Sequence, residues 1–264
     1  SYPQARAYAP PPENPITPSV CPALGRLLET ARPIDATLGV PGLPQSATGQ
    51  ATMLTGRNAA RHAGRHIEGF PGPALRDFVA ADNIYHRCRA NDLDATFANG
   101  YLYDTLQAVR GMRRQSVTTV AALSGLRAVR LLPDLLNHAA VAHDLTRETL
   151  FRRGYRGPVI TPERAATDLC GIAAAQHFTL FEHFLTDRAG HAAQRRTAEK
   201  ALRLLDRFLA QALQEAPALG LTVLLTSDHG NLESMATSMH TRNPVPCSVT
   251  GPGAATLRRR AAGL

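Results

Sequence analysis

The stretch LTVLLTSDHG, residues 221–230, is an apolar run of strand length that passes directly into a polar Ser-Asp-His-Gly turn. Apolar strands that alternate with helices are typical of a parallel sheet covered on both faces. Two further strands are expected at residues 95–99 and 178–185, and an amphipathic helix is expected through residues 202–213. The sequence therefore predicts an α/β fold, with a mostly parallel sheet sandwiched by helices.

Polar residues follow both long apolar runs. Asp228 and His229 end the first run, and Asp187 and His191 follow the run at 178–185. Ligands of parallel sheets collect at the carboxyl ends of the strands. If a helix begins near Asp187, the two residues of the second pair lie on one face, because they are four apart. A simple helix cap with an incidental surface His is the competing interpretation of this pair.

Two more polar side chains lie in loops. His240 opens the segment HTRNPVP, residues 240–246, whose two prolines stiffen the loop. Ser46 lies in PQSATGQ, residues 44–50, where a helix is expected to begin. The N-terminus of a helix favours an anion, which suits a hydroxyl that ionises and then carries a phosphoryl group. A surface His and an N-cap Ser are the plain alternatives.

Together these positions supply two Asp, three His and one Ser. Oxygen and imidazole ligands without thiolates suit Zn²⁺ or Mn²⁺. Two close cations could hold the attacking and leaving oxygens of an in-line displacement, and one could lower the pKa of the serine hydroxyl. The set therefore indicates metal-dependent phosphoryl transfer.

The amino-acid sequences of these segments resemble the motifs of a known family. TSDHGN (226–231), DRAGH (187–191) and HTRNPVP are similar to the metal-binding motifs of cofactor-independent phosphoglycerate mutases, which belong to the alkaline phosphatase superfamily. LPQSATGQATMLTGRNA, residues 43–59, resembles the nucleophile region of smaller mutase-like metalloenzymes of that superfamily. The resemblance runs from about residue 15 to residue 253 and implies an alkaline phosphatase-like fold.

The resemblance also implies roles for individual residues. It implies two divalent metal ions, Mn²⁺ or Zn²⁺ with Mg²⁺ also accepted, and a serine nucleophile that forms a phosphoserine intermediate. One ion would be bound by Asp187, His191 and His240, the second by Asp228 and His229, and the nucleophile would be Ser46. Three residues close to these in sequence are expected to contact the substrate: Asn58, His66 and Arg242, the last by pairing with phosphate.

The chain departs from the family pattern at its ends and in its middle. The family begins with a strand ending in Asp-Gly, whose Asp completes the second metal site, and Asp35 is too close to Ser46 to replace it. The chain is therefore expected to be trimmed at both ends. The expected domains are a metal-binding core at 1–98 and 156–264 and a small cap at 99–155, in place of the family's large inserted transferase domain.

The missing insert bears on the expected reaction. Hydrolysis of a phosphomonoester is favoured over mutase activity on phosphoglycerate. Two alternatives stay open. One is a phosphomutase or phosphotransferase acting on a small metabolite. The other is a catalytically impaired relative that acts as a binding protein because the N-terminal ligand Asp is absent.

The resemblance implies a small phosphorylated substrate, and the absence of a signal pattern or membrane span leads us to expect a cytoplasmic protein. No apolar run reaches bilayer length, which argues against a membrane partner. The net charge of +8 is almost entirely Arg, since Lys200 is the only lysine, and the arginines are scattered. Few aromatic residues and no Trp disfavour nucleic acid as a partner. The four cysteines include no Cys-x-x-Cys pair, which argues against a zinc finger or a disulfide framework.

Overall fold

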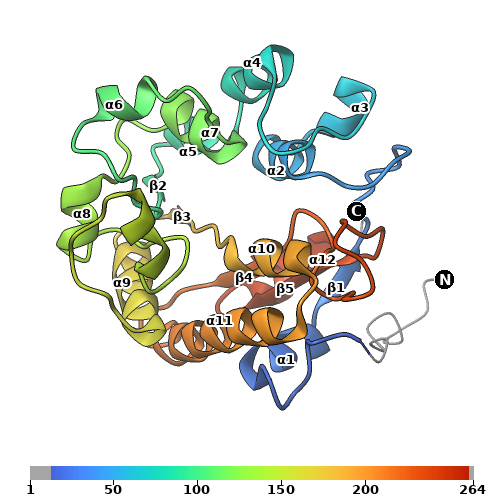
Figure 1. Cartoon of the computed structure of the whole chain (residues 1–264). Helices are drawn as coiled ribbons and strands as arrows, with labels where there is room; N and C mark the ends of the chain where they lie inside the picture. The colour runs from blue at the N-terminus through green and yellow to red at the C-terminus, as the bar shows by residue number, and fades with distance from the viewer. Residues whose placement is uncertain (1–12, 262–264) are drawn as a thin grey trace.

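The computed structural model describes residues 13–261, and the expected core domain reaches beyond them at 1–12 and 262–264. Helices surround two small sheets, so the α/β prediction is confirmed (Figure 1). The strands are β1 (Arg32–Ile34), β2 (Ala95–Phe97), β3 (Phe178–Leu180), β4 (Val223–Thr226) and β5 (Val245–Thr250). The helices are α1 (Pro22–Glu29), α2 (Ser46–Thr55), α3 (Ala59–Ala63), α4 (Pro73–Ala81), α5 (Ile84–Ala90), α6 (Leu106–Arg110), α7 (Val117–Gly125), α8 (Leu132–Leu136), the 3₁₀ helix η1 (Glu148–Arg153), α9 (Pro162–Ala174), α10 (Leu185–Ala192), α11 (Arg195–Glu215) and α12 (Ala254–Ala261).

The strands pair in both directions. β2 and β3 are parallel, as the sequence predicts, and the long helical connection between them permits this pairing. β4, β5 and β1 instead form an antiparallel sheet in the order β1-β5-β4, so the prediction of a mostly parallel sheet is wrong for these three strands. The reason is the connection: residues 227–244 join β4 to β5 without a helix, so the chain turns back beside the strand it has just left.

The predicted strand at 178–185 is shorter in the structure. β3 ends at Leu180, and α10 begins at Leu185. Asn99, which follows β2, donates from its side chain to the carbonyl of Glu182 and accepts from the Glu182 N–H, at 2.7 and 2.9 Å. These bonds fix the chain just beyond β3, and the turn into α10 follows directly.

One hydrophobic cluster lies under the antiparallel sheet. The predicted amphipathic helix is confirmed as α11, which buries Leu202, Phe208 and Leu209 against α9 and α1. Figure 1 shows α1 and α11 below β4 and β5, and α10 is drawn above these strands. α10 contacts α11, and its Ala189 is buried in the same hydrophobic cluster as Leu202 of α11.

A second cluster joins α2, α4, α5 and α7 with β2. Residues 101–155 contain the short helices α6, α7, α8 and η1, joined by loops. Pro133 lies in the first turn of α8, where its missing N–H costs nothing. α7 packs on α2, so the segment 99–155 contacts the helix that begins at Ser46, and its description as a separate cap stays a prediction. No helix within residues 13–261 is both long and apolar enough to cross a membrane.

Candidate metal centre

Asp187 and His191 lie one turn apart on α10. Their spacing of four brings the Asp187 carboxylate and the His191 Nε2 atom to 3.4 Å. The N-cap of α10 is Phe184, so Asp187 is not the helix cap that the competing interpretation required. The Asp187 Oδ1 atom is buried and has no hydrogen-bond partner within the described chain. A buried, unpaired carboxylate oxygen needs a cation or a donor to offset its desolvation.

His240 completes the group from another part of the chain. Its Nε2 atom lies 3.6 Å from Asp187 Oδ1 and 3.2 Å from His191 Nε2. The Nδ1 atom of His240 donates to the Pro44 carbonyl, and that of His191 donates to the Ser238 carbonyl, each at 2.8 Å. Both rings are thus oriented by their outer nitrogen, so that in the neutral tautomer each Nε2 lone pair faces the other and the carboxylate.

These three atoms have the spacing of a coordination shell. Ligand atoms about 2.1 Å from a tetrahedral ion lie about 3.4 Å from one another, by the bond lengths typical of zinc sites. The observed separations of 3.2, 3.4 and 3.6 Å bracket that value. Asp187, His191 and His240 form the one group of three or more such side chains with metal-site spacing within residues 13–261. The residues present therefore fit a divalent cation.

A second group lies beside the first, at the end of β4. His229 Nε2 is 3.6 Å from Asp228 Oδ1, 3.9 Å from Asp187 Oδ1 and 2.9 Å from the Ser46 hydroxyl. The His229 and His240 rings stack with centroids 3.6 Å apart, which joins the two groups. Asp35 takes no part, because its carboxylate accepts the N–H and O–H of Thr37 within its own turn.

Ser46 is the first residue of α2, and Gln45 is the N-cap. The serine hydroxyl is therefore not used for capping, contrary to the plain alternative, and it points at His229. Gly49 makes this possible, because a Cβ atom there would lie 2.6 Å from the Asp228 carbonyl oxygen. Glycine lets the loop after β4 pack directly on α2, and Gln50 then donates to Asp228 Oδ2 at 3.1 Å.

The charges of the cluster shift the pKa values of its members. Burial opposes ionisation of Asp187, but the adjacent His240, His229 and His191 rings outweigh it and lower the carboxyl pKa. Burial also opposes protonation of His240, but Asp187 and the Pro44 carbonyl outweigh it and raise the imidazole pKa. For His229 burial dominates, and its pKa is lowered despite the nearby Asp228. Without a cation, the site therefore holds an ionised carboxylate and favours a proton on His240.

The C-terminal part of the chain matches a known family. Residues 170–263 match the model of the metalloenzyme superfamily, and this segment contains all five predicted metal ligands. The chain is a relative of alkaline phosphatase-like metalloenzymes. This relationship and the Asp187–His191–His240 cluster indicate a divalent-metal site.

Curated proteins that are similar to this chain include 2,3-bisphosphoglycerate-independent phosphoglycerate mutases. The one from Wolinella succinogenes is 33% identical over 103 residues, covering 37% of this chain and 21% of that enzyme. The one from Cyanothece sp. is 41% identical over 66 residues, covering 23% of this chain and 12% of that enzyme. A phosphoglycerate mutase structure from Leishmania mexicana aligns with a TM-score of 0.41 and 12% identity, covering 65% of this chain and 32% of that one. The chain spans at most about a fifth of the length of these curated relatives.

The predicted substrate contacts fall into two kinds. Arg242 donates to the Gly42 carbonyl at 3.1 Å, and His66 Nε2 lies 3.2 Å from the Val40 carbonyl. Both thus flank the loop that leads to Ser46. Asn58 instead caps α3, accepting the Arg61 N–H and donating to the Leu38 carbonyl. Each end of its amide makes one hydrogen bond within this local structure, and its contact with substrate stays a prediction.

Glu182 lies near enough to Asp228 for that charge to affect it, and sequence reasoning missed it. Burial raises the pKa of its carboxyl to about 8, opposed by the hydrogen bond from Thr118 and reinforced by the charge of Asp228. Its position gave a signal: it follows the apolar run of β3 as Asp228 follows that of β4. Gln50, which holds Asp228, was also missed, although it lies within the quoted nucleophile segment.

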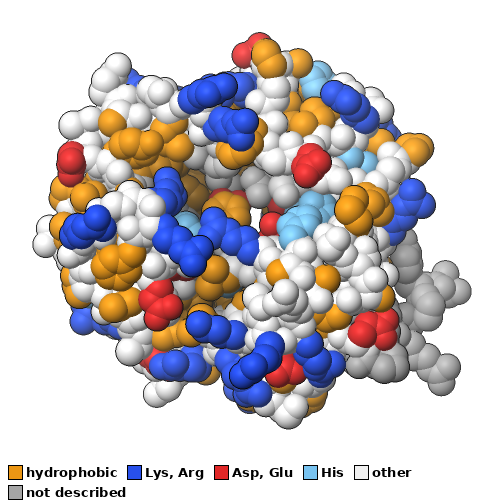
Figure 2. Space-filling model, in the orientation of Figure 1, with side chains coloured by type: hydrophobic (Ala, Val, Ile, Leu, Met, Phe, Trp, Pro, Cys, Tyr) orange, Lys and Arg blue, Asp and Glu red, His pale blue; other side chains and the backbone are white. Residues whose placement is uncertain are grey.

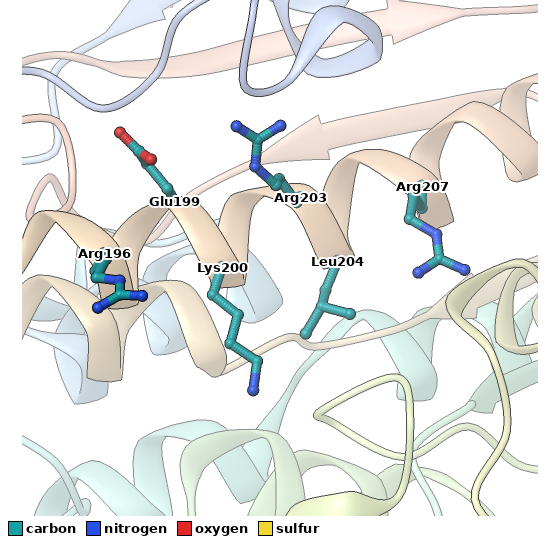
Figure 3. A pocket seen from close by; sticks show the side chains of 6 residues that line it. All are labelled: Arg196, Glu199, Lys200, Arg203, Leu204 and Arg207. Atoms are coloured by element: carbon teal, nitrogen blue, oxygen red, sulfur yellow. The ribbon is translucent and has the colours of Figure 1, made fainter.

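The surface around the centre differs from the basic face of α11. Figure 2 shows a hollow near the middle of one face, with His and acidic side chains at its edge and Lys and Arg side chains beside it. A separate surface hollow of about 280 Å³ lies on α11 and is lined by Arg196, Glu199, Lys200, Arg203, Leu204 and Arg207. In Figure 3 these side chains fan out around the helix, as expected for a solvated face, and no predicted metal ligand lines the hollow.

Proposed function

We propose that this chain catalyses divalent-metal-dependent phosphoryl transfer, and that its reaction is hydrolysis of a small phosphomonoester through a phosphoserine at Ser46. The observation that carries the proposal is the position of the Ser46 hydroxyl, 2.9 Å from His229 Nε2 and beside the cation-sized group of Asp187, His191 and His240. A nucleophile next to cation ligands is the arrangement that in-line displacement at phosphorus needs.

The proposed ligands form two metal-binding positions. Asp187, His191 and His240 would hold one ion, and Asp228 with His229 would hold a second, Mn²⁺ or Zn²⁺ being the ions that suit this donor set. The bound ions would neutralise phosphate charge and help the serine hydroxyl to ionise. Arg242 would pair with a phosphate oxygen, because its guanidinium lies against the loop before Ser46.

The proposed chemistry has two displacements. Ser46 Oγ loses its proton to solvent and attacks phosphorus, forming the Oγ–P bond while the P–O bond to the leaving group breaks and that oxygen takes a proton from water. The N-terminus of α2 favours the negative charge that Ser46 carries as an alkoxide and then as a phosphoserine. Water then attacks phosphorus, and Ser46 regains its proton as phosphate leaves.

The test is turnover of a generic aryl phosphate by protein loaded with Mn²⁺, Zn²⁺ or Mg²⁺. We expect turnover by the wild type, loss of turnover in Ser46→Ala, and acid-stable label on Ser46 after a quenched reaction with ³²P-labelled substrate. Ser19→Ala, an exposed serine outside the centre, is the matched control.

The outcomes separate the alternatives. Transfer of the label to an added acceptor alcohol in preference to water would replace hydrolysis by phosphotransferase activity. Tight metal binding without turnover or labelling would contradict an enzyme and favour a binding protein, consistent with a second group that contains only Asp228, His229 and Ser46 within the described residues.

A further inference from the structure

Glu233 lies two residues beyond the Asp228–Asn231 turn and is used by neither predicted metal group. It is half-buried, and its carboxylate accepts three hydrogen bonds from two segments. One Glu233 oxygen, Oε2, accepts the Asn231 N–H at 2.7 Å. The other, Oε1, accepts the Thr241 hydroxyl and the Asn243 side-chain amide, the latter at 3.0 Å.

The two segments joined by Glu233 are those that present His229 and His240. Asn231 is two residues after His229, and Thr241 directly follows His240. The Thr241 N–H also donates to the Gly230 carbonyl at 2.9 Å, so the segments are held by backbone and side-chain bonds together. The result is the stacking of the two imidazoles at 3.6 Å with their planes 17° apart.

The same unit reaches the third ligand-bearing segment, α10. The side chain of Asn231 packs on Gly190, where a Cβ atom would lie 1.2 Å from Asn231 Oδ1. Gly190 directly precedes His191, so the Asn231 side chain lies against the helix turn that carries a metal ligand. Asn231, held by Glu233, therefore touches the segments of all three histidines.

We propose that Glu233 is a positioning residue of the metal centre, whose carboxylate sets the separation and mutual orientation of His229 and His240. The inference rests on the proposed metal centre. Ionised acceptors form the stronger class of hydrogen bond, and outer-sphere partners of metal ligands commonly change affinity by about 10–100-fold. A carboxylate is suited to the role because one group offers enough lone pairs for three donors from different segments.

The test uses Co²⁺ as the probe, since its visible absorption reports both affinity and ligand geometry. Glu233→Ala is expected to weaken Co²⁺ binding by about 10–100-fold and to change the spectrum at saturating Co²⁺. Glu233→Gln is expected to fall between Ala and wild type, because its amide N–H₂ opposes a backbone N–H while its oxygen can still accept. Glu199→Gln, a half-buried carboxylate paired with Arg195 on α11, is the matched control.

A milder variant covers the case in which Glu233→Ala does not fold. Thr241→Val keeps the backbone bond to Gly230 and removes the hydroxyl that donates to Glu233 and accepts the Asn243 N–H. The double variant Thr241→Val/Glu233→Gln should lose less Co²⁺ affinity than the sum of the losses in the two single variants, because both substitutions remove parts of one hydrogen-bond network. Unchanged Co²⁺ affinity and spectrum in these variants would overturn the inference while leaving the metal centre intact. Absence of Co²⁺ binding by the wild type would overturn the centre itself, and the inference with it.

Discussion

The Nε2 atoms of His191 and His240 lie 3.2 Å apart, although each ring already donates from Nδ1 to a backbone carbonyl. Two neutral imidazoles held this way point lone pairs at each other, which is unfavourable unless a proton or a cation lies between them. The backbone carbonyls thus prepare the pair for a positive charge, and the Asp187 carboxylate beside them reinforces that preference.

Removal of one imidazole should cost most of the cation affinity. We expect His191→Ala to weaken Co²⁺ or Zn²⁺ binding by more than about 100-fold, because even outer-sphere changes cost about 10–100-fold. Competition with a chelator of known affinity measures the loss. His177→Ala, an exposed imidazole that accepts the Asp94 N–H, is the control and should bind as the wild type does. Equal affinities for the two variants would remove His191 from the centre.

Cation binding should weaken as the pH falls. The raised pKa of His240 means that its proton stabilises the metal-free fold below pH 6.5, and that this contribution is lost as the pH rises through the folded value. A cation must displace that proton, so affinity should fall about tenfold per pH unit below the folded pKa of His240. The lowered pKa of Asp187 contributes fold stability that is present above pH 3.8 and lost as the pH falls through the folded value, so this ligand stays ionised over the range of the prediction.

The measurement for this prediction is calorimetric titration between pH 5 and 8 in two buffers of different ionisation enthalpy, which counts the protons released. Proton release on cation binding is expected to grow as the pH falls below the folded pKa of His240. A pH-independent affinity would contradict the assignment of His240 as a ligand.

Much of the centre was predictable because its signals are local. The spacing of Asp187 and His191 needs only the helix period, and the Asp228-His229 pair after an apolar run needs only the polarity of a strand. The α/β class follows from the same runs. What the structure adds is convergence: His240 reaches the site because its ring is tied to the Pro44 carbonyl, a contact across 196 positions that no local pattern contains.

The features that escaped prediction depend on tertiary packing. β5 begins between two prolines, Pro244 and Pro246, in a segment that the sequence suggests is a loop, and it becomes a strand through its antiparallel pairing with β4. Glu182 follows the apolar run of β3, which is a weak signal, and its burial beside Asp228 and Thr118 becomes visible only in the structure. The role of Gly190 is likewise invisible in sequence, because what lies against it comes from a loop 41 residues later, at Asn231.

Gly190 should tolerate no side chain. Gly190→Ala places a methyl group 1.2 Å from Asn231 Oδ1, so α10 and the loop must separate, at a cost of about 1–3 kcal/mol in the unfolding free energy of the metal-free protein. Gly171→Ala is the matched control: it lies in α9 with nothing within 4 Å of the new Cβ, and should stabilise by about 0.5–1 kcal/mol. Urea unfolding measures both free energies. A change of the same sign in the two variants would contradict the close packing of Asn231 on Gly190.

Glu182 should make the metal-free protein less stable as the pH rises. Its folded pKa of about 8 exceeds the ordinary 4.5, so the folded state binds the proton more tightly and stability declines between these two values. One pKa unit corresponds to about 1.4 kcal/mol, so the decline is on the order of a few kcal/mol. Glu182→Gln cannot ionise and keeps an acceptor for the Thr118 hydroxyl, so it should be more stable than the wild type at pH 9, and its stability should depend less on pH.

Urea unfolding at pH 5, 7 and 9 in the presence of a chelator measures the stability of both proteins, with Glu148→Gln at an exposed position as the control. Burial is the largest cause of the raised pKa. If the wild type and Glu182→Gln lost stability equally as the pH rises, the Glu182 carboxyl would be solvated, and the assignment of a buried Glu182 carboxyl beside Asp228 would be wrong.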